Sequence, residues 1–499
     1  MRESVNMMQG FTRIMRALLT RSRSQYAALI IFSGMGLADF LFRTHIFPVY
    51  TYSLQKIGAK PIWTDLDVGF APIVWLSFFA IILGSLTIVI TFASQNVPKL
   101  IDLYMDHWQS LLFVWWSAAC LIHALTIKVL AEVGADIVPS LVFNYHVLLA
   151  VSLVIGFPFV FSILRSTKTS NVIENLLQGS YATFKHLTKK GPTGKISHQE
   201  HEKIQYKLFE ELNQLMDLLV YVPYKEPKAQ IIEGIGALLQ NYVQSKSNFP
   251  EYFFKIDQRI YEDISFRTMK NLLGEAEKSH TFYEQKSFRL IGNVYNIFLE
   301  TGEFDLSTLC VEQLVQIGKT AIECDDQELI EVVTVRLNTY FRFALKHGQH
   351  HNEPRNLYNL VFHYGQFLGY LVEYKQVDRT RTCIGYFVFY GQQCFNAISR
   401  AGSLAFILDV LASEMQKLMI KIQQKNWDRE LQDELLQKFL LFDNFQDMNK
   451  NFAIQFFSQN HGIRLLHIGL ALFYLNKKED EFANIIAQDT VQDFILMGE

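Results

Sequence analysis

The stretch Phe70–Phe92, FAPIVWLSFFAIILGSLTIVITF, decides how the chain is organised, together with the segment ASQNVPKLI that follows it at 93–101. The stretch is long and apolar enough to cross a lipid bilayer as a helix. Small and hydroxyl-bearing residues recur in two interleaved series of seven-residue period and share one helical face: Ser77, Ala80, Gly84, Thr87, Thr91 and Ser94. The sequence therefore predicts a membrane-spanning helix with a small-residue stripe along one side.

Two interpretations of the stripe are open at this point. Small residues let two helices approach closely, so the stripe can be a packing seam that follows a left-handed crossing. The same face can instead line a narrow aqueous path around a symmetry axis, because hydroxyl groups replace part of the hydration shell of an ion. Both interpretations require small side chains on one face, and the pattern does not separate them.

Three further segments are apolar over a length that spans a bilayer: Tyr26–Phe42, Leu111–Leu130 and Val138–Leu164. Arginines crowd the first 25 residues, and Arg165 and Lys168 follow the last segment, whereas residues 129–137 contain neither Lys nor Arg. Basic residues stay on the cytoplasmic side of a membrane. We therefore predict four crossings with both termini in the cytoplasm, in a bacterial inner membrane.

Composition divides the chain into two parts. Half of the 499 residues are hydrophobic and 14% are aromatic, while the net charge is only −3, which gives no reason to expect a nucleic-acid partner. The five cysteines form no CxxC pair, as expected in a reduced compartment. The expected domains are a basic, interfacial tail (1–25), a four-helix transmembrane domain (26–165), a connector (166–200) and a cytoplasmic domain (201–499).

The cytoplasmic domain reads as helical throughout. Apolar residues recur with helical spacing in segments such as Glu202–Val220 and Gln327–Lys346, and strict alternation is almost absent. The predicted fold class is all-α, with the transmembrane domain followed by antiparallel helix pairs. A solenoid is one arrangement of such pairs, but no fixed repeat period is detected in the sequence.

Five polar or ionisable side chains are expected inside the membrane: Asp39, Arg43, His123, Asn144 and His146. Each is costly in hydrocarbon and needs a partner or a function. Asp39 and Arg43 are four residues apart on one helix, which favours a salt bridge over an ion-pathway charge. The other three favour hydrogen bonds between helices over a proton relay.

No catalytic motif stands out, so we expect no enzyme activity and no cofactor. Residues 191–195 (GPTGK) lack the spacing of a phosphate-binding loop. His347, His350 and His351 are expected in a solvated loop, and His198 with His201 in the connector. Three imidazoles with Glu353 nearby can bind zinc, but a solvated loop is the favoured interpretation, and we predict no metal site at either group.

The turn formed by Ser94, Gln95, Pro98 and Lys99 resembles a bacterial family of predicted membrane proteins of unknown function, over roughly residues 26–165. In that family a serine- and threonine-bearing span leads into a Ser-Gln-x-x-Pro-Arg-like turn, and Lys99 stands where the family has Arg. The resemblance implies the membrane topology and no activity. Physically, Pro98 ends the span and Lys99 lies among anionic head groups.

The leading functional hypothesis is a homo-oligomeric, channel-like pore that the striped helix lines and the cytoplasmic domain gates. The alternative is a membrane-anchored helical scaffold without transport activity. The expected partners are membrane lipids, further copies of the chain and, under the alternative, a protein that binds the cytoplasmic domain.

Overall fold

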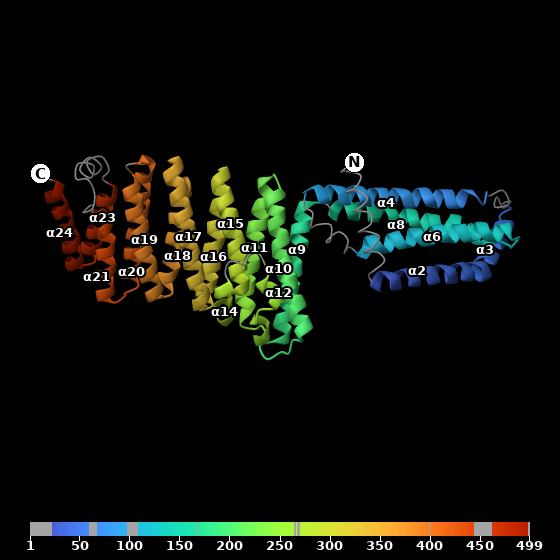
Figure 1. The fold of residues 1–499 in the computed structure, drawn as a ribbon, viewed down its shortest axis with the longest axis horizontal. Helices are drawn as coiled ribbons and strands as arrows, with labels where there is room; N and C mark the ends of the chain where they lie inside the picture. The colour runs from blue at the N-terminus through green and yellow to red at the C-terminus, as the bar shows by residue number, and fades with distance from the viewer. Residues whose placement is uncertain are drawn as a thin grey trace. The chain divides into compact units, whose positions relative to one another are not determined.

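The computed structural model describes residues 22–58, 67–96, 108–166, 168–263, 266, 270–398, 400–443 and 462–497. All regular secondary structure in these ranges is helical, as predicted for an all-α protein (Figure 1). The chain divides into two compact units, unit 1 at residues 1–175 and unit 2 at residues 176–499. The division falls inside the stretch 166–200 that was expected to connect two domains.

Before α9, the described residues of unit 1 form four helical segments, each continuous or interrupted by a single π-helical turn. In order, its helices and π-helical turns are α2 (Ser22–Leu41), η1 (Phe42–Ile46), α3 (Phe47–Lys56), α4 (Phe70–Asn96), α6 (Trp108–Glu132), α7 (Val138–Val142), η3 (Phe143–Leu148) and α8 (Leu149–Ser166). Pro139 lies in the first turn of α7, where the N–H that proline lacks has no helical partner anyway, whereas Pro48 of α3 directly follows the π-helical turn η1 within a continuous helical segment.

Three helices of unit 1 are long and apolar enough to cross a membrane: Ala28–Lys56, Leu112–Glu132 and Val138–Gly156. Within α4, the apolar stretch whose side chains are described is the shorter Phe70–Ser85. Its sixteen residues rise about 24 Å, less than the ~30 Å of a hydrocarbon core, although α4 itself continues to Asn96. The described part of unit 1 therefore contains three candidate membrane-spanning helices, and not the four that the sequence predicts.

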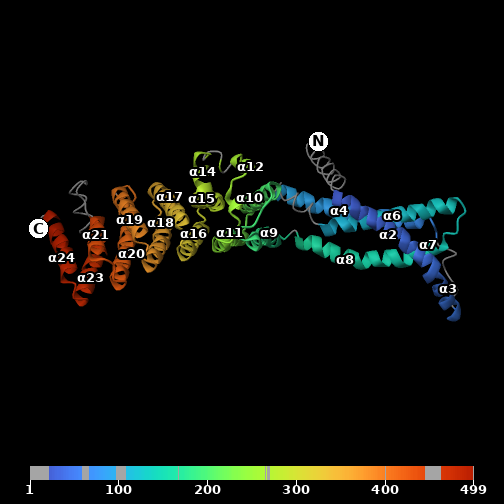
Figure 2. The same cartoon turned by 90° about the horizontal axis from the view of Figure 1, so that it is seen from below.

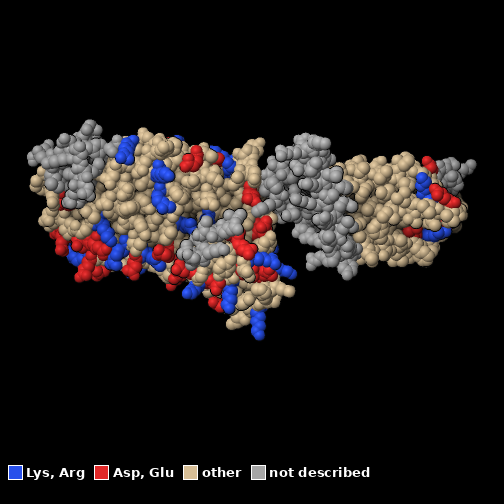
Figure 3. Space-filling view, in the orientation of Figure 1, with Lys and Arg blue, Asp and Glu red and all other residues tan. Residues whose placement is uncertain are grey.

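Helix α6 packs against α2, α4 and α8, and Figure 1 shows it between α4 and α2. Its buried residues include Ala119, Cys120 and Ala124, whose small side chains let neighbouring helices approach closely. Trp75 of α4 and Val142 of α7 pack into the same core. Charged side chains on the visible face of unit 1 gather at one end (Figure 3).

Unit 2 begins within α9 and continues through antiparallel helices. In order, its elements are α9 (Thr169–Lys190), α10 (His198–Tyr221), α11 (Lys225–Lys246), η4 (Glu251–Phe254), α12 (Gln258–Tyr261), α14 (Lys270–Lys278), α15 (Phe282–Thr301), α16 (Phe304–Glu323), α17 (Gln327–His351), α18 (Arg355–Glu373), α19 (Val377–Ala397), η5 (Gly402–Leu404), α20 (Ala405–Gln424), α21 (Arg429–Leu440), η6 (Leu441–Asp443), α23 (Gly462–Asn476) and α24 (Asp480–Met497).

A turn with the same backbone geometry recurs along unit 2. Asp325, Lys375, Asn426 and Lys478 all have positive φ angles and follow one another at intervals of 50, 51 and 52 residues. At each of them the amide of the next residue donates to a carbonyl five residues earlier, as Gln376 N does to Leu371 O at 2.9 Å. This is the hydrogen bond of a Schellman helix end. From α16 onward, unit 2 is therefore a helical-repeat structure with a period near 51 residues.

The repeating pairs stack into two layers (Figures 1 and 2). One layer runs through α11, α16, α18, α20 and α23, and the other through α10, α15, α17, α19, α21 and α24. Apolar residues at helical spacing explain the stacking, as on α16, where one face is buried between the layers: Leu306, Cys310, Leu314, Ile317 and Ala321. Each pair buries its apolar faces only when its neighbours are present.

Candidate functional site

Three residues of the predicted stripe on α4 face away from the other described helices of unit 1, whereas a fourth, Thr87, is half-buried. Ser77, Ala80 and Gly84 are exposed, and no neighbouring group lies within 4 Å of the point where a Cβ on Gly84 would stand. These three residues therefore form no seam with another described helix of the same chain. Thr91, Ser94 and Gln95 belong to α4 with side chains outside the described part, and Pro98 and Lys99 lie outside the described residues.

The hydroxyl groups of the stripe bond to their own helix. Ser77 Oγ donates to the carbonyl of Ile73 at 2.9 Å, and Thr87 Oγ1 donates to the carbonyl of Leu83 at 2.7 Å. Such bonds satisfy a hydroxyl proton within an apolar helix. The exposed face of α4 can thus meet lipid or a second copy of the chain without an unsatisfied donor at these two residues.

A cluster of polar side chains connects the four helical segments described in unit 1. Trp75 Nε1 (α4) donates to Asn144 Oδ1 (η3) at 2.7 Å, and Asn144 Nδ2 lies 3.0 Å from His123 Nδ1 (α6). His123 Nε2 lies 3.5 Å from Asp39 Oδ2 (α2), which accepts a hydrogen bond from Ser140 Oγ (α7) at 2.8 Å. Polar groups inside an apolar bundle need such interhelical partners.

The remaining two polar residues of this set lie elsewhere. The guanidinium of Arg43 lies 3.5 Å from the carboxylate of Asp136, in the loop between α6 and α7. This salt bridge takes the place of the one with Asp39 that the sequence favoured. A π-helical turn begins at Phe42 and changes the number of residues per turn, which removes the alignment of positions four apart. His146 is exposed on η3 and takes no part in the cluster of Asp39, His123 and Asn144.

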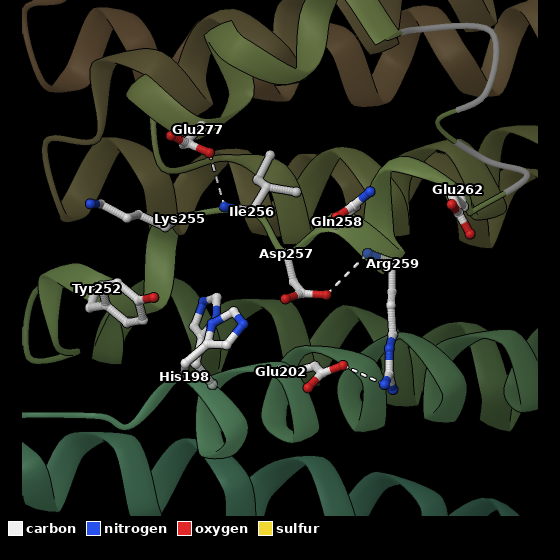
Figure 4. A pocket seen from close by; sticks show the side chains of 11 residues that line it. His198, Glu202, Tyr252, Lys255, Ile256, Asp257, Gln258, Arg259, Glu262 and Glu277 are labelled. Carbon is white, nitrogen blue, oxygen red and sulfur yellow. Dashed lines mark hydrogen bonds and ion pairs between the residues drawn. The ribbon is translucent and has the colours of Figure 1, made fainter.

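A pocket of about 470 Å³ lies in unit 2, between the start of α10 and the loop that joins η4 to α12 (Figure 4). Its wall brings together His198 and His201 from the first turn of α10 and Asp257 from the loop. The two histidines are three residues apart and share one helix face. One ligand atom from each of the three side chains lies within 4.8 Å of the other two.

Gln205 attaches the loop to the helix that carries the histidines. Its side chain is fully buried, and its Nε2 donates to the carbonyls of Phe253 and Lys255, both at 2.7 Å. Its Oε1 accepts a hydrogen bond from the amide of Asp257 at 3.0 Å. The backbone position of Asp257 is therefore set by a residue one helical turn after His201.

Neighbouring groups hold the other charges of the pocket. Asp257 Oδ1 accepts from the amide of Arg259 at 3.0 Å and caps α12, and the guanidinium of Arg259 pairs with Glu202 (Figure 4). Glu277 Oε2 accepts from the amide of Ile256 at 2.9 Å. The carboxylate of Asp257 lies on the side of the pocket where His198 is drawn (Figure 4).

His201 is the most deeply buried of the three ligand candidates. It is 2% exposed, and neither of its ring nitrogens has a hydrogen-bond partner of good geometry. Burial lowers the pKa of the imidazole, and the nearby carbonyls of Phe253 and Lys255 oppose that effect only in part. The ring is thus kept in the neutral form, which is the form that ligates metals.

Sequence reasoning missed this arrangement, since nothing in the spacing of His198 and His201 points to Asp257. The only available signal was an HxxH pair at a helix start, which is weak alone. His347, His350 and His351 lie on the last turn of α17 and not in a loop, with neighbouring ring centroids 4.4 and 4.9 Å apart. Among the described residues, three possible metal-ligand atoms lie close together at His198, His201 and Asp257, but not at the histidine cluster on α17.

Comparison with known proteins identifies no relative. No family model matches the chain, and no curated protein matches its sequence. A solved structure of a circular tandem repeat protein with novel repeat topology and enhanced subunit contact surfaces is similar to it, with 13% identity, a TM-score of 0.40, and coverage of 95% of this chain and 96% of that one. The resemblance at Ser94–Lys99 to a family of membrane proteins stays a prediction.

Proposed function

We propose that the chain is a membrane-anchored helical-repeat scaffold, in which unit 1 holds the protein in a bilayer and unit 2 binds a protein partner. Large apolar side chains on the outside of unit 1 support the anchoring, among them Leu29, Ile30, Leu37 and Phe40, which are 60–68% exposed. Apolar patches of this kind are rare on soluble monomers. In the proposed topology α4 provides a fourth crossing, and both termini lie in the cytoplasm of a bacterium.

The observation that carries the scaffold proposal is the exposed face of the layer formed by α16, α18, α20 and α23. Tyr358 and Phe406, from successive repeats, stack with ring centroids 5.8 Å apart and are 42% and 53% exposed. Phe362 is 39% exposed one turn after Tyr358. Stacked repeats offer an extended surface of this kind to other proteins, and aromatic side chains supply most of the binding energy at such surfaces. The proposed partner is a protein segment with apolar side chains.

The scaffold proposal is tested by substituting one exposed aromatic residue on the proposed binding face and, as a control, one in the other layer. The full chain is purified in detergent from the cells that make it, and co-purifying proteins are quantified by mass spectrometry. Phe406→Asp should lower the yield of a specific partner about tenfold, the effect of losing one aromatic contact. Phe389→Asp is the matched control, because Phe389 is 51% exposed on α19 in the other layer. Identical partner profiles for the wild type and the Phe406 variant would refute the scaffold.

A channel-like pore is the second candidate, and the outward face of α4 favours it. Ser77, Ala80 and Gly84 are available to further copies of the chain around an axis. Conductance is measured on the reconstituted full chain. Gly84→Leu should change the single-channel current if the face lines a pore, whereas loss of the oligomer would indicate a packing seam. Ile81→Leu conserves the side-chain volume at a residue that is 70% exposed beside the stripe, so it should leave both unchanged.

A further inference from the structure

We propose that His198, His201 and Asp257 bind a divalent transition-metal ion of the Zn²⁺ class, in a site separate from the surfaces that the scaffold and pore proposals use. The three ligand types are those that Zn²⁺ takes in proteins: two imidazoles and one carboxylate. A His₂Asp set leaves one coordination position to water or to an added ligand, and the pocket of about 470 Å³ provides the space for it.

The distances are close to those that coordination requires. Zn–N and Zn–O bonds of about 2.0–2.2 Å put ligand atoms about 3.3 Å apart in a tetrahedral site. The three ligand atoms here lie within 4.8 Å of one another before any ion draws them together. His198 is exposed and can change its rotamer freely, whereas His201 and the backbone of Asp257 are held in place by packing and by Gln205.

The buried imidazole of His201 points independently to a ligand. A polar side chain that is 98% buried normally has a hydrogen-bond partner, because an unsatisfied buried polar group costs free energy. Both nitrogens of His201 lack one of good geometry, and the two nearest carbonyls already accept from Gln205. Coordination of one nitrogen to a metal ion supplies the missing interaction.

The charge around the pocket favours a cation. The start of a helix carries a partial positive charge, which opposes a cation at His198 and His201. Four carboxylates line the pocket against two cationic side chains, a formal net charge of −2 that favours a cation. Besides Asp257, these carboxylates are Glu202, Glu262 and Glu277. Glu202 pairs with the guanidinium of Arg259, and Glu277 accepts a hydrogen bond from the amide of Ile256. These two contacts hold side chains and backbone of the pocket wall in place.

Zinc uptake by the purified full-length chain tests the site. After dialysis against a chelator, the chain is titrated with Zn²⁺ in competition with a chromophoric chelator, and then with Co²⁺ to record the visible absorption of a four-coordinate ion. We expect one ion per wild-type chain. His198 is exposed, so His198→Ala should keep the circular-dichroism spectrum of the wild type. This variant should weaken binding at least ~100-fold, more than the usual loss of an outer-shell partner.

Two further variants separate this site from its alternatives. Asp257→Asn should weaken binding as His198→Ala does, while His350→Ala, in the histidine cluster on α17, should bind as the wild type does. If His350→Ala lowers the affinity and His198→Ala does not, the metal is at the other cluster and the proposal is overturned. A wild type that takes up no more Zn²⁺ than His198→Ala also overturns it.

Discussion

At the scale of single residues, one buried lysine links three helices of unit 2 through ion pairs. Lys246 Nζ, at the end of α11, lies 2.9 Å from Glu284 Oε1 of α15 and 2.7 Å from Asp326 Oδ2, the residue that caps α17. Lys246 is 9% exposed and Glu284 is fully buried. Burial raises the pKa of Glu284 against the opposing effect of Lys246. The carboxylate therefore depends on this one ammonium group.

Removing that ammonium group should destabilise unit 2 strongly. Lys246→Met leaves Glu284 and Asp326 without their cation and should lower the free energy of unfolding by about 3–5 kcal/mol. Lys225→Met is the control, because Lys225 pairs with Asp305 at 3.2 Å at the surface and should change the free energy by less than ~1 kcal/mol. Thermal unfolding of the two purified variants compares their stabilities. Equal unfolding midpoints would show that the buried ion pairs of Lys246 stabilise the fold no more than a surface pair does.

His467 makes the stability of the C-terminal repeat depend on pH. The side chain is 1% exposed on α23, and burial is the largest cause that lowers its pKa to about 4, with Asp489 opposing and Arg464 adding to the effect. The unfolded pKa is about 6.5. Because the folded pKa is the lower one, protonation favours unfolding, and the stabilisation is complete above pH ~6.5.

We expect on the order of 3 kcal/mol to be lost as the pH falls from about 6.5 to about 4. His467→Leu cannot bind this proton, so its unfolding midpoint should fall less steeply than that of the wild type over the same pH range. The midpoints are measured by circular dichroism at matched ionic strength. Parallel pH profiles for the two proteins would contradict a buried, neutral imidazole at this position.

The helix-ending turn is the element that repeats most faithfully in unit 2. At Lys375 the backbone has a φ of 54°, in the left-handed region that is unfavourable for residues with a Cβ and open to glycine. The same conformation occurs at Asp325, Asn426 and Lys478, so different residues accept the strain at equivalent positions. The hydrogen bond that closes each turn offsets that cost.

Lys375→Gly should therefore raise the free energy of unfolding by up to ~1 kcal/mol. Lys346→Gly, at an exposed position within α17, should lower it by about the same amount, because glycine there loses helix propensity. Chemical denaturation of both variants gives the comparison. A destabilised Lys375→Gly would mean that the positive φ angle is not the feature that matters at this turn.

The sequence predicts these elements far better than it predicts their order in space. Helical spacing is sufficient to identify α16 or α18 as amphipathic, and the all-α class is confirmed. The 51-residue period was not detected because the repeated feature is a backbone angle, and Asp, Lys, Asn and Lys at equivalent turns share no side-chain chemistry. All four side chains are exposed, so packing does not restrict which residue stands at the turn.

The pocket with His198 and Asp257 was beyond sequence reasoning for a similar reason. Two histidines on one helix turn can be read directly from their spacing, but their proximity to Asp257 depends on Gln205, which binds a loop about fifty residues away. The polar cluster of unit 1 was closer to expectation, because an apolar helix leaves few partners for His123 and Asn144. The pairing of Asp39 was missed, since the π-helical turn after it leaves no sequence pattern.

At the scale of the whole molecule, the proposed function requires unit 1 to be in a membrane and unit 2 to be on its cytoplasmic side. The number of crossings decides which side each end is on. With α4 as a fourth crossing, both ends of the chain lie on the same side, whereas the three described apolar helices alone would put them on opposite sides. Cys324 is the natural reporter, because it is the exposed cysteine and the other four are buried.

Burial and the acidic neighbours Glu323 and Asp326 raise the pKa of the Cys324 thiol, so labelling should be slow near neutral pH and faster in mildly alkaline buffer. The most direct measurement uses a membrane-impermeant maleimide on sealed bacterial cells that make either the wild type or an Arg2→Cys, Cys324→Ser variant. We predict that neither thiol is labelled until the membrane is permeabilised. Labelling of either thiol in sealed cells, or recovery of the chain in the soluble fraction after lysis, would contradict a four-crossing anchor with a cytoplasmic helical-repeat scaffold.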